Sequence, residues 1–315
     1  MSISSVFKRR LVKLGPKHPA LKLALRYEAK RQGYRLQFAS GKIAIEQGNR
    51  RIELAESSFI LTPFVLEYFG SYFSTVCSDH KDGFECLDFS APRLQRYIRQ
   101  SVSLWAVTVP EEDVIDAYTH WYPPRPGDIV FDLGAHAGVT AYQLAQMVGP
   151  AGVVYAFEPD DLSYEYLLKN IELHRLTNVI PVKKAIAGRD AALQFNMDGS
   201  IAAGLVECVK YTGASTVKTV EALTLETACR QLGVTPSFIK MDVEGAESDI
   251  IAAASDFLRE NPIHFAIESG HVVRGKPTHE QLDILFRQIG YTVATSHDYG
   301  EPITWARPAH VFAPA

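Results

Sequence analysis

Residues 130–138 read VFDLGAHAG, an apolar run that ends in a turn with two glycines. The run is typical of a buried strand, and the residues after Gly138 have helical spacing. A ligand at such a turn lies beside the free N–H groups and the positive end of the helix. Because glycine has no side chain, Gly134 and Gly138 let that ligand approach the backbone closely. The stretch therefore indicates a nucleotide-like ligand at the end of a strand.

The order of residues in this turn separates two kinds of nucleotide cofactor. A dinucleotide site typically reads G-x-G-x-x-G, and its middle glycine admits the pyrophosphate. With Gly134 as the first glycine, His136 stands at the second position and Val139 at the third. The turn is instead D-x-G-A-x-x-G, beginning at Asp132, which favours a ligand without pyrophosphate. His136 is expected there for backbone reasons, because histidine tolerates the positive φ of tight turns.

Strands and helices are expected to alternate from residue 128 onward. Apolar runs predict strands at 128–133, 153–157, 179–182, 238–242, 263–268 and 291–295. Helical spacing predicts helices at 139–148, at 163–173 with Ser163 as the cap, and at 278–288. This alternation predicts a parallel α/β sheet covered on both faces, whose ligand lies at the carboxyl ends of the strands. Glycines that separate short pieces at about 190–222 predict a hairpin insertion.

Residues 1–125 are expected to form an N-terminal α+β extension that contributes to substrate binding or oligomerisation, followed by a ligand-binding domain at 126–315. In the extension, 34–45 and 51–60 could pair as strands, and 91–104 is expected to be helical. Residues 1–31 hold nine Lys or Arg and one acid. The whole chain carries −4, so an arm of +8 leaves −12 on the remainder. Such an arm suggests an anionic surface or partner, or simply a solvated helix.

Two acidic residues are expected at the ligand. Glu158 ends the second strand, 24 residues after Gly134, where it can accept both ribose hydroxyls of a bound adenosine. Lys240 and Asp242 are two residues apart and share a face of a strand. They either pair with each other to order the strand end or act on the ligand. Asp242, at the carboxyl end, would face the ligand cleft.

A further group of candidates follows the fifth strand, where Glu268 and His271 stand. Asp242 and Glu268 could together bind Mg²⁺ through oxygen, or one of them could assist proton transfer. His271 is a candidate base, since its unperturbed pKa lies near neutral pH. No third metal ligand is obvious in the sequence, so we favour the metal-free alternative. Lys240 is kept as a catalytic candidate.

Four stretches resemble the FkbM-type methyltransferases, a group of class I S-adenosylmethionine-dependent enzymes. They are VFDLGAHAGVTA, GVVYAFEPDDLSYEYLLKNIELHRLTNV, the TLET at 224–227 and above all FIKMDVEGAE, and the resemblance covers about residues 126–270. It implies a Rossmann-like sheet of seven strands with the last one antiparallel. It also implies methyl transfer from S-adenosylmethionine to a hydroxyl of a sugar, polyketide or related natural product.

The resemblance also assigns residues to the cofactor. It places Asp132, Gly134, Ala135 and Gly138 in the cofactor loop, Glu158 at the ribose and Asp242 at the fourth strand. Family members often have Asn where this chain has His136, so His136 belongs to the same loop without an assigned contact.

Composition limits the partners. A net charge of −4 gives little attraction to nucleic acid, and no apolar run reaches the ~20 residues that span a bilayer. We therefore expect a cytoplasmic enzyme with a small hydroxylated acceptor, and the sequence leaves a homodimer open. Two alternatives are an NAD-dependent oxidoreductase, which the glycine pattern disfavours, and a non-catalytic module that only binds the cofactor.

Overall fold

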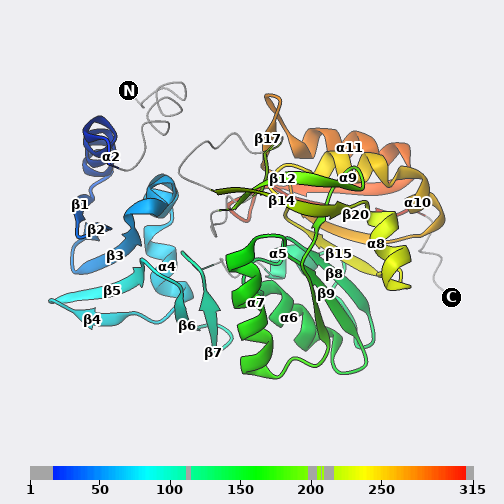
Figure 1. The fold of residues 1–315 in the computed structure, drawn as a ribbon, viewed down its shortest axis with the longest axis horizontal. Helices are drawn as coiled ribbons and strands as arrows, with labels where there is room; N and C mark the ends of the chain where they lie inside the picture. Colours follow the sequence, from blue (N-terminus) through cyan, green and yellow to red (C-terminus); the bar gives the residue numbers. More distant parts are fainter. Residues whose placement is uncertain (1–16, 111–114, 198–203, 207, 209–215, 310–315) are drawn as a thin grey trace. The chain divides into compact units, whose positions relative to one another are not determined.

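The computed structural model describes residues 17–110, 115–197, 204–206, 208 and 216–309. The described residues form two compact units, one up to residue 110 and one from residue 115 (Figure 1). The first 16 residues of the basic arm expected at 1–31 lie outside the described residues. The rest of the arm contains the helix α2 (Pro19–Arg31).

A seven-stranded sheet forms the centre of the second unit, in the order β10-β9-β8-β15-β16-β20-β19. Its strands are β8 (Ile129–Leu133), β9 (Val153–Phe157), β10 (Val179–Val182), β15 (Phe238–Met241), β16 (His264–Glu268), β19 (Tyr291–Ser296) and β20 (Ile303–Pro308). Only β20, the last strand of the chain, runs antiparallel to its neighbours. The expected α/β class with seven strands and an antiparallel last strand is therefore confirmed.

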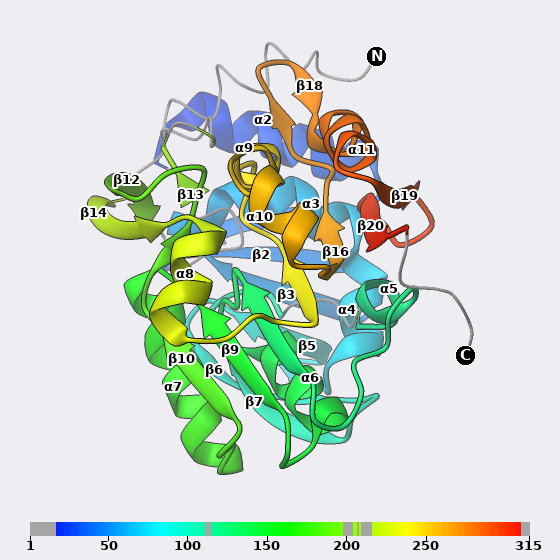
Figure 2. The ribbon, with the colours of Figure 1, turned by 90° about the vertical axis from the view of Figure 1, so that its right-hand side faces the viewer.

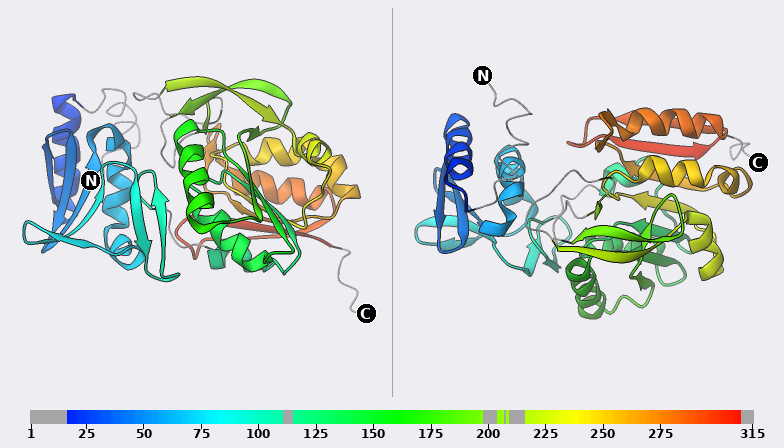
Figure 3. Two further views of the ribbon diagram at one scale, coloured as in Figure 1. Left: turned by 60° about the horizontal axis from the view of Figure 1, so that its bottom comes forward. Right: turned by 45° about the horizontal axis from the view of Figure 1, so that its top comes forward.

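Helices cover both faces of this sheet. They are α6 (Val139–Val148) and α7 (Asp161–His174) in one layer, and α8 (Leu225–Leu232), α9 (Glu247–Ala253), α10 (Ser255–Glu260) and α11 (Thr278–Gln288) in the other. Alternate strand residues face the two layers: Val130 packs in the core of α6, and Phe131 packs in the core of α9. Figure 2 and Figure 3 show the first layer in green and the second in yellow to orange.

The predicted elements of this unit agree closely with the structure. The strands at 153–157 and 179–182 and the helices at 139–148 and 278–288 have the expected bounds. The helix expected to be capped by Ser163 begins earlier, at Asp161. Its cap is Asp160, whose carboxylate accepts hydrogen bonds from the amides of Leu162 and Ser163, both at 2.9 Å. Asp160 satisfies two amides that have no partner inside the helix, which fixes the start of α7.

The first unit is an α+β structure around a five-stranded sheet in the order β1-β2-β3-β5-β4. Its strands are β1 (Arg35–Ala39), β2 (Lys42–Gln47), β3 (Arg50–Ala55), β4 (Asp79–Lys81) and β5 (Phe84–Phe89). Its helices after α2 are η1 (Glu56–Leu61), α3 (Thr62–Glu67) and α4 (Phe69–Thr75). The pairing predicted between 34–45 and 51–60 is found as β2 against β3, while 34–45 itself holds the hairpin of β1 and β2.

The helix predicted at 91–104 is wrong. The segment forms β6 (Arg93–Tyr97), which pairs antiparallel with β7 (Val102–Ala106). Buried side chains alternate along the hairpin, with Gln95 and Tyr97 buried on one strand and Leu104 and Ala106 on the other. This period of two is that of a strand with one buried face, and it was not recognised because a polar residue, Gln95, stands at one of the buried positions.

The insertion expected at about 190–222 is a hairpin of β12 (Ala191–Met197) and β14 (Thr216–Leu223), in a small sheet with β11 (Ala185–Ile186) and β13 (Gly204–Leu205). Residues 198–203, 207 and 209–215 of the insertion lie outside the described residues. The helix α5 (Ile115–Thr119) precedes the boundary expected at 125/126, yet it belongs to the second unit, because the indole N–H of Trp305 donates to the carbonyl of Ala117 at 2.6 Å. Among the described helices, none has the length and apolar character needed to cross a membrane.

Candidate active site

The turn after β8 is attached to the end of β9 by backbone hydrogen bonds. The amides of Gly134 and Ala135 both donate to the carbonyl oxygen of Phe157, at 3.1 and 3.0 Å. The amide of Gly138 donates to the carbonyl of Ala135 at 2.7 Å, and Gly138 then stands as the N-cap of α6. The expected strand–turn–helix is therefore present, with its turn fixed in one conformation.

The two glycines are required by space as well as by conformation. Gly134 and Gly138 have φ angles of 77° and 86°, and a Cβ at Gly138 would lie 2.5 Å from the side chain of Leu167. A Cβ at Gly134 would lie 1.8 Å from the backbone oxygen of Asp242, so the turn touches the loop after β15 directly. His136 also has a positive φ, of 47°, as the tight turn was expected to impose.

Lys240 pairs with Asp132 rather than with Asp242. Register places Lys240 beside Asp132 on the adjacent strands β15 and β8, and its Nζ lies 3.2 Å from Asp132 Oδ1. The same Nζ donates to the carbonyl oxygen of Gly134 at 2.9 Å. The side chains of Lys240 and Asp132 are 4% and 0% exposed, so neither reaches a ligand from solvent. This buried pair joins the centre of the sheet to the backbone of the turn through Lys240.

Glu158 ties the turn to the start of α7. One carboxylate oxygen accepts from the amide of His136 at 2.8 Å, and the other accepts from the amide of Asp160 at 2.7 Å. The residue is 6% exposed. Burial raises the pKa of Glu158 to about 7, although the nearby His136 and the amide of Asp160 oppose that shift. Glu158 therefore changes its charge near neutral pH at the edge of the ligand turn.

The turn, Glu158 and Asp242 meet at the topological switch point of the sheet. The chain passes from β8 to β9 on one side, while β15 pairs with β8 on the other side. Ligands of open α/β sheets bind in the crevice outside the strands at this point. The residues present fit S-adenosylmethionine: carboxylates at two strand ends suit a nucleoside with a positively charged tail, and His136 fills the place of a pyrophosphate-binding glycine.

Beyond β15 and β16, an imidazole lies among four carboxylates. Nε2 of His271 is 3.9 Å from Oδ1 of Asp242, 3.8 Å from Oε1 of Glu268 and 3.4 Å from Oε2 of Glu244. Its Nδ1 is 2.9 Å from Oε1 of Glu247. The structure thus brings together Asp242, Glu268 and His271, which the sequence had placed at the ends of the fourth and fifth strands.

The charges of this cluster are strongly coupled. Burial lowers the pKa of the His271 imidazole, but the carboxylates of Glu247 and Glu244 outweigh burial and hold that pKa well above its usual value. Burial, and then the charge of Asp242, raise the pKa of Glu268 well above its usual range. The carboxylates therefore favour the protonated imidazole, and His271 could act as a base only after losing the proton that they hold.

Two residues of the cluster were missed in the sequence analysis, Glu244 and Glu247. Glu247 is fully buried, and its Oε1 also accepts from the amides of Gly245 and Val243, at 3.0 and 3.4 Å. Glu244 has a positive φ of 57°, which turns the loop back over the strand end. The signal was present in the VEGAE string itself, since acids that flank a glycine after a buried strand face the ligand edge of the sheet.

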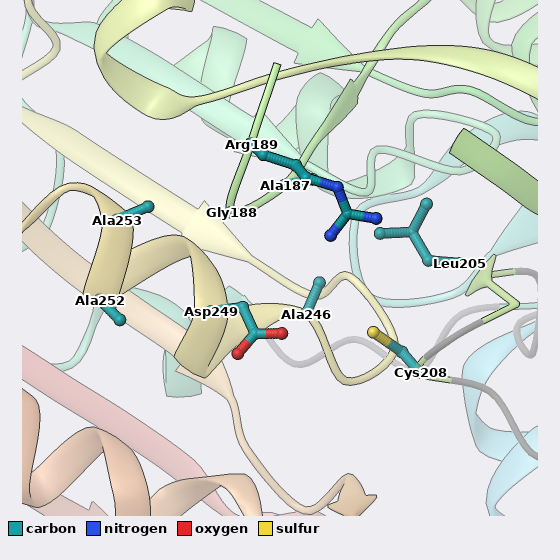
Figure 4. Close-up of a pocket in the computed structure, with 9 residues that line it drawn as sticks. All are labelled: Ala187, Gly188, Arg189, Leu205, Cys208, Ala246, Asp249, Ala252 and Ala253. Carbon is teal, nitrogen blue, oxygen red and sulfur yellow. The ribbon is translucent and has the colours of Figure 1, made fainter. Parts of the chain in front are cut away.

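A pocket of about 310 Å³ lies beside this loop, between α9 and the segment after β11. Figure 4 shows Arg189 and Asp249 on facing walls, with Ala246 and Cys208 nearby. None of the residues predicted for the site lines this pocket.

Comparisons with known proteins agree with the expected family. The family model described as "Methyltransferase FkbM domain" matches residues 132–293, more than half of the chain. The 31-O-demethyl-FK506 methyltransferase FkbM of Streptomyces tacrolimicus is 26% identical over 208 residues, which cover 57% of this chain and 78% of that protein. The crystal structure of methyltransferase FkbM from Methylobacillus flagellatus has a TM-score of 0.42 at 16% identity, over 60% of this chain and 45% of that one.

A shorter similarity is to a tRNA methyltransferase. The catalytic subunit of a tRNA (adenine(58)-N(1))-methyltransferase of Yarrowia lipolytica is 29% identical over 96 residues, which cover 28% of this chain and 24% of that protein. The sheet and the glycine turn are those of the class I fold of S-adenosylmethionine-dependent methyltransferases. Within that class, the chain belongs to the FkbM methyltransferase family.

Proposed function

We propose that this chain is an O-methyltransferase that transfers the methyl group of S-adenosylmethionine to a hydroxyl of a small natural product, such as a sugar or a polyketide. The observation that carries the proposal is the cluster of Asp242, Glu268 and His271 at the carboxyl ends of β15 and β16, next to the glycine turn. An alcohol is a weak acid, so its methylation needs groups that take up a proton beside the cofactor. The Streptomyces relative supports the acceptor class, because its name describes methylation of 31-O-demethyl-FK506.

The cofactor side of the site is assigned to the turn and to two carboxylates. S-adenosylmethionine supplies an activated methyl group when bound. Glu158 would accept hydrogen bonds from the ribose hydroxyls, and Gly134, Ala135, His136 and Gly138 would lie along the nucleoside. Asp132 and Lys240 would not touch it, because both side chains are buried against the turn.

The acceptor side is assigned to the acid–histidine cluster. Asp242 lies between the two halves of the site and would face both the charged tail of the cofactor and the acceptor. Glu268 and His271 would orient the hydroxyl and receive its proton. The hydroxyl of Tyr118 on α5 donates to Glu268 Oε2 at 3.4 Å, which holds that carboxylate at the strand end.

A small-molecule acceptor is preferred to RNA, although two of the curated relatives are a tRNA methyltransferase and a protein named as a putative rRNA 2′-O-methyltransferase. Those two matches cover only 28% and 18% of this chain. The net charge of −4 would repel rather than attract a polyanion. We also place the enzyme in the cytoplasm, since all four cysteines are free. A homodimer stays a prediction.

The alternatives differ in their ligand and in turnover. An NAD-dependent oxidoreductase would need room for a pyrophosphate at His136, and a non-catalytic module would bind the cofactor without transferring its methyl group. Incubation of the full chain with S-adenosylmethionine and a panel of hydroxylated metabolites, followed by mass spectrometry, tests the proposal. We expect a product 14 mass units heavier than its acceptor, the difference between a hydroxyl and its methyl ether, at a hydroxyl oxygen. Methylation only on nitrogen, or only of RNA, would overturn the O-methyltransferase assignment.

A further inference from the structure

The imidazole of His271 lies against a buried carboxylate. Its Nδ1 lies 2.9 Å from Oε1 of Glu247, whose side chain has no exposure to solvent. The backbone of the same residue is fixed as well, since the amide of Thr278 donates to the carbonyl of His271 at 2.8 Å. A carboxylate on one imidazole nitrogen is the arrangement that orients histidines whose other nitrogen binds a metal ion.

The other nitrogen, Nε2, faces carboxylate oxygens that are too distant for good hydrogen bonds. The separations to Asp242 and Glu268 are 3.9 and 3.8 Å, and the separation to Glu244 is 3.4 Å. Four ligand atoms arranged as a tetrahedron about 2.1 Å from one ion would lie about 3.4 Å from one another. One ligand atom each from Asp242, Glu268 and His271 lies within 4.8 Å of the other two. These separations are somewhat wider than the tetrahedral value, so the three side chains would move toward one another around a single ion.

A second observation concerns Asp242, whose side chain is 28% exposed. Its Oδ1, the oxygen that faces His271, is buried and accepts no hydrogen bond from the described residues. A buried carboxylate oxygen without a donor is costly unless a cation compensates it. The atom lies at the carboxyl end of β15 and is turned toward the other two groups.

From these observations we propose that Asp242, Glu268 and His271 bind one divalent first-row transition-metal ion, such as Zn²⁺ or Mn²⁺, with Glu244 beside it as a fourth oxygen ligand. An imidazole ligand favours a transition metal over Mg²⁺, which prefers oxygen alone. Mg²⁺ held only by Asp242 and Glu268, as the sequence had suggested, would not use Nε2 of His271, which faces both carboxylates. The histidine is instead the third ligand that the sequence did not reveal.

The role of the metal ion in methyl transfer rests on the proposed function. A metal ion at the strand ends could coordinate the oxygen of the acceptor hydroxyl, which would make its proton easier to remove. Binding of the ion itself depends on neither the acceptor nor S-adenosylmethionine.

The test is direct titration of the full chain, freed of metal with EDTA and dialysed, with Co²⁺ and Mn²⁺. Co²⁺ is followed by its visible absorption and Mn²⁺ by electron paramagnetic resonance. We expect one ion per chain and binding at least tenfold tighter than that of Mg²⁺ in competition. His271→Gln, Asp242→Asn and Glu268→Gln should each weaken binding at least 100-fold, and Glu247→Gln should weaken it 10- to 100-fold.

The matched control is His80→Gln, which removes an exposed histidine on β4 and should leave binding unchanged. No binding of either ion by the wild type overturns the proposal, and this outcome needs no variant to fold. Binding that is unchanged in the folded His271→Gln variant also overturns it, because the ion then lies elsewhere. If the ion binds as proposed but no hydroxyl is methylated, the metal site stands and the proposed O-methyltransferase function fails.

Discussion

Asp132 and Lys240 face each other across two adjacent parallel strands, with Nζ 3.2 Å from Oδ1 and both side chains almost completely buried. Lys240 also donates to the carbonyl of Gly134, so the pair joins the centre of the sheet to the cofactor turn. The lysine of the FIKMDVEGAE stretch thus donates a hydrogen bond to the backbone of the VFDLGAHAG stretch. The two motifs are one structural unit.

The first prediction concerns this pair. Lys240→Met keeps the volume but leaves the charge of Asp132 buried without its partner, so the free energy of unfolding should fall by about 3–5 kcal/mol. Urea unfolding followed by circular dichroism measures it. The control is Lys184→Met, which removes a pair with the exposed carboxylate of Glu221 and should change stability by no more than about 1 kcal/mol. Equal losses in the free energy of unfolding would show that the buried pair stabilises the fold no more than the exposed pair does.

The second prediction separates two reasons for glycine at position 134, the lack of space for a Cβ and the positive φ. Gly134→Ala should destabilise the fold strongly, since its Cβ would overlap the backbone oxygen of Asp242 at 1.8 Å. Gly233→Ala is the matched control, because Gly233 has a left-handed backbone, with a φ of 68° and a ψ of 26°, but nothing within 4 Å of a Cβ. The control should cost only about 1 kcal/mol of conformational strain. Thermal unfolding of both variants tests this, and a well-folded Gly134→Ala would contradict the close approach of the two loops.

The third prediction is the pH dependence that Glu158 causes. Its carboxyl has a pKa of about 7 in the folded protein against 4.5 as its ordinary value, so the folded state keeps a proton that the unfolded state releases. Stability from this group is therefore complete below about pH 4.5 and is lost as the pH rises to about 7. The loss amounts to about 3 kcal/mol for a shift of about 2.5 pH units.

Glu158→Gln should remove this dependence between pH 5 and 7, whereas Glu165→Gln, at an exposed carboxyl on α7, should keep it. Urea unfolding at a series of pH values is the measurement. A wild-type stability that rises steadily over the same range, with no difference between the two variants, would refute the account of Glu158.

The fourth prediction concerns the ribose. Glu158→Ala should weaken S-adenosylmethionine binding about 10- to 100-fold, because charge-assisted hydrogen bonds contribute about 1.5–3 kcal/mol. Calorimetry at pH 8, where the wild-type carboxyl is ionised, gives the cleanest comparison. An unchanged affinity in a folded Glu158→Ala protein would remove Glu158 from the cofactor site.

The sequence was sufficient for six of the seven strands of the sheet, because these are short apolar runs. The seventh, β20, reads ITWARP and followed only from the family resemblance. The sequence was insufficient where a contact depends on register between distant segments. Spacing suggested that Lys240 pairs with Asp242, two residues away, but the register of β15 against β8 places it beside Asp132. The hairpin at 93–106 was missed for a different reason, because the buried positions of its first strand are Gln95 and Tyr97 rather than aliphatic residues.

In the candidate site, too, the sequence could place some residues but not all of their contacts. Gly134, Glu158 and Asp242 could be placed from the motifs because each ends a recognisable strand. The pairing of Glu247 with His271 could not, because it depends on how the loop after β15 folds back against the segment after β16.

The central claim is that the crevice at the end of β8 and β15 holds S-adenosylmethionine. Calorimetric titration of the purified full chain with S-adenosylmethionine, and separately with NAD, tests it most directly. We predict one S-adenosylmethionine per chain and no measurable heat of binding with NAD. Binding of NAD without binding of S-adenosylmethionine would contradict the account.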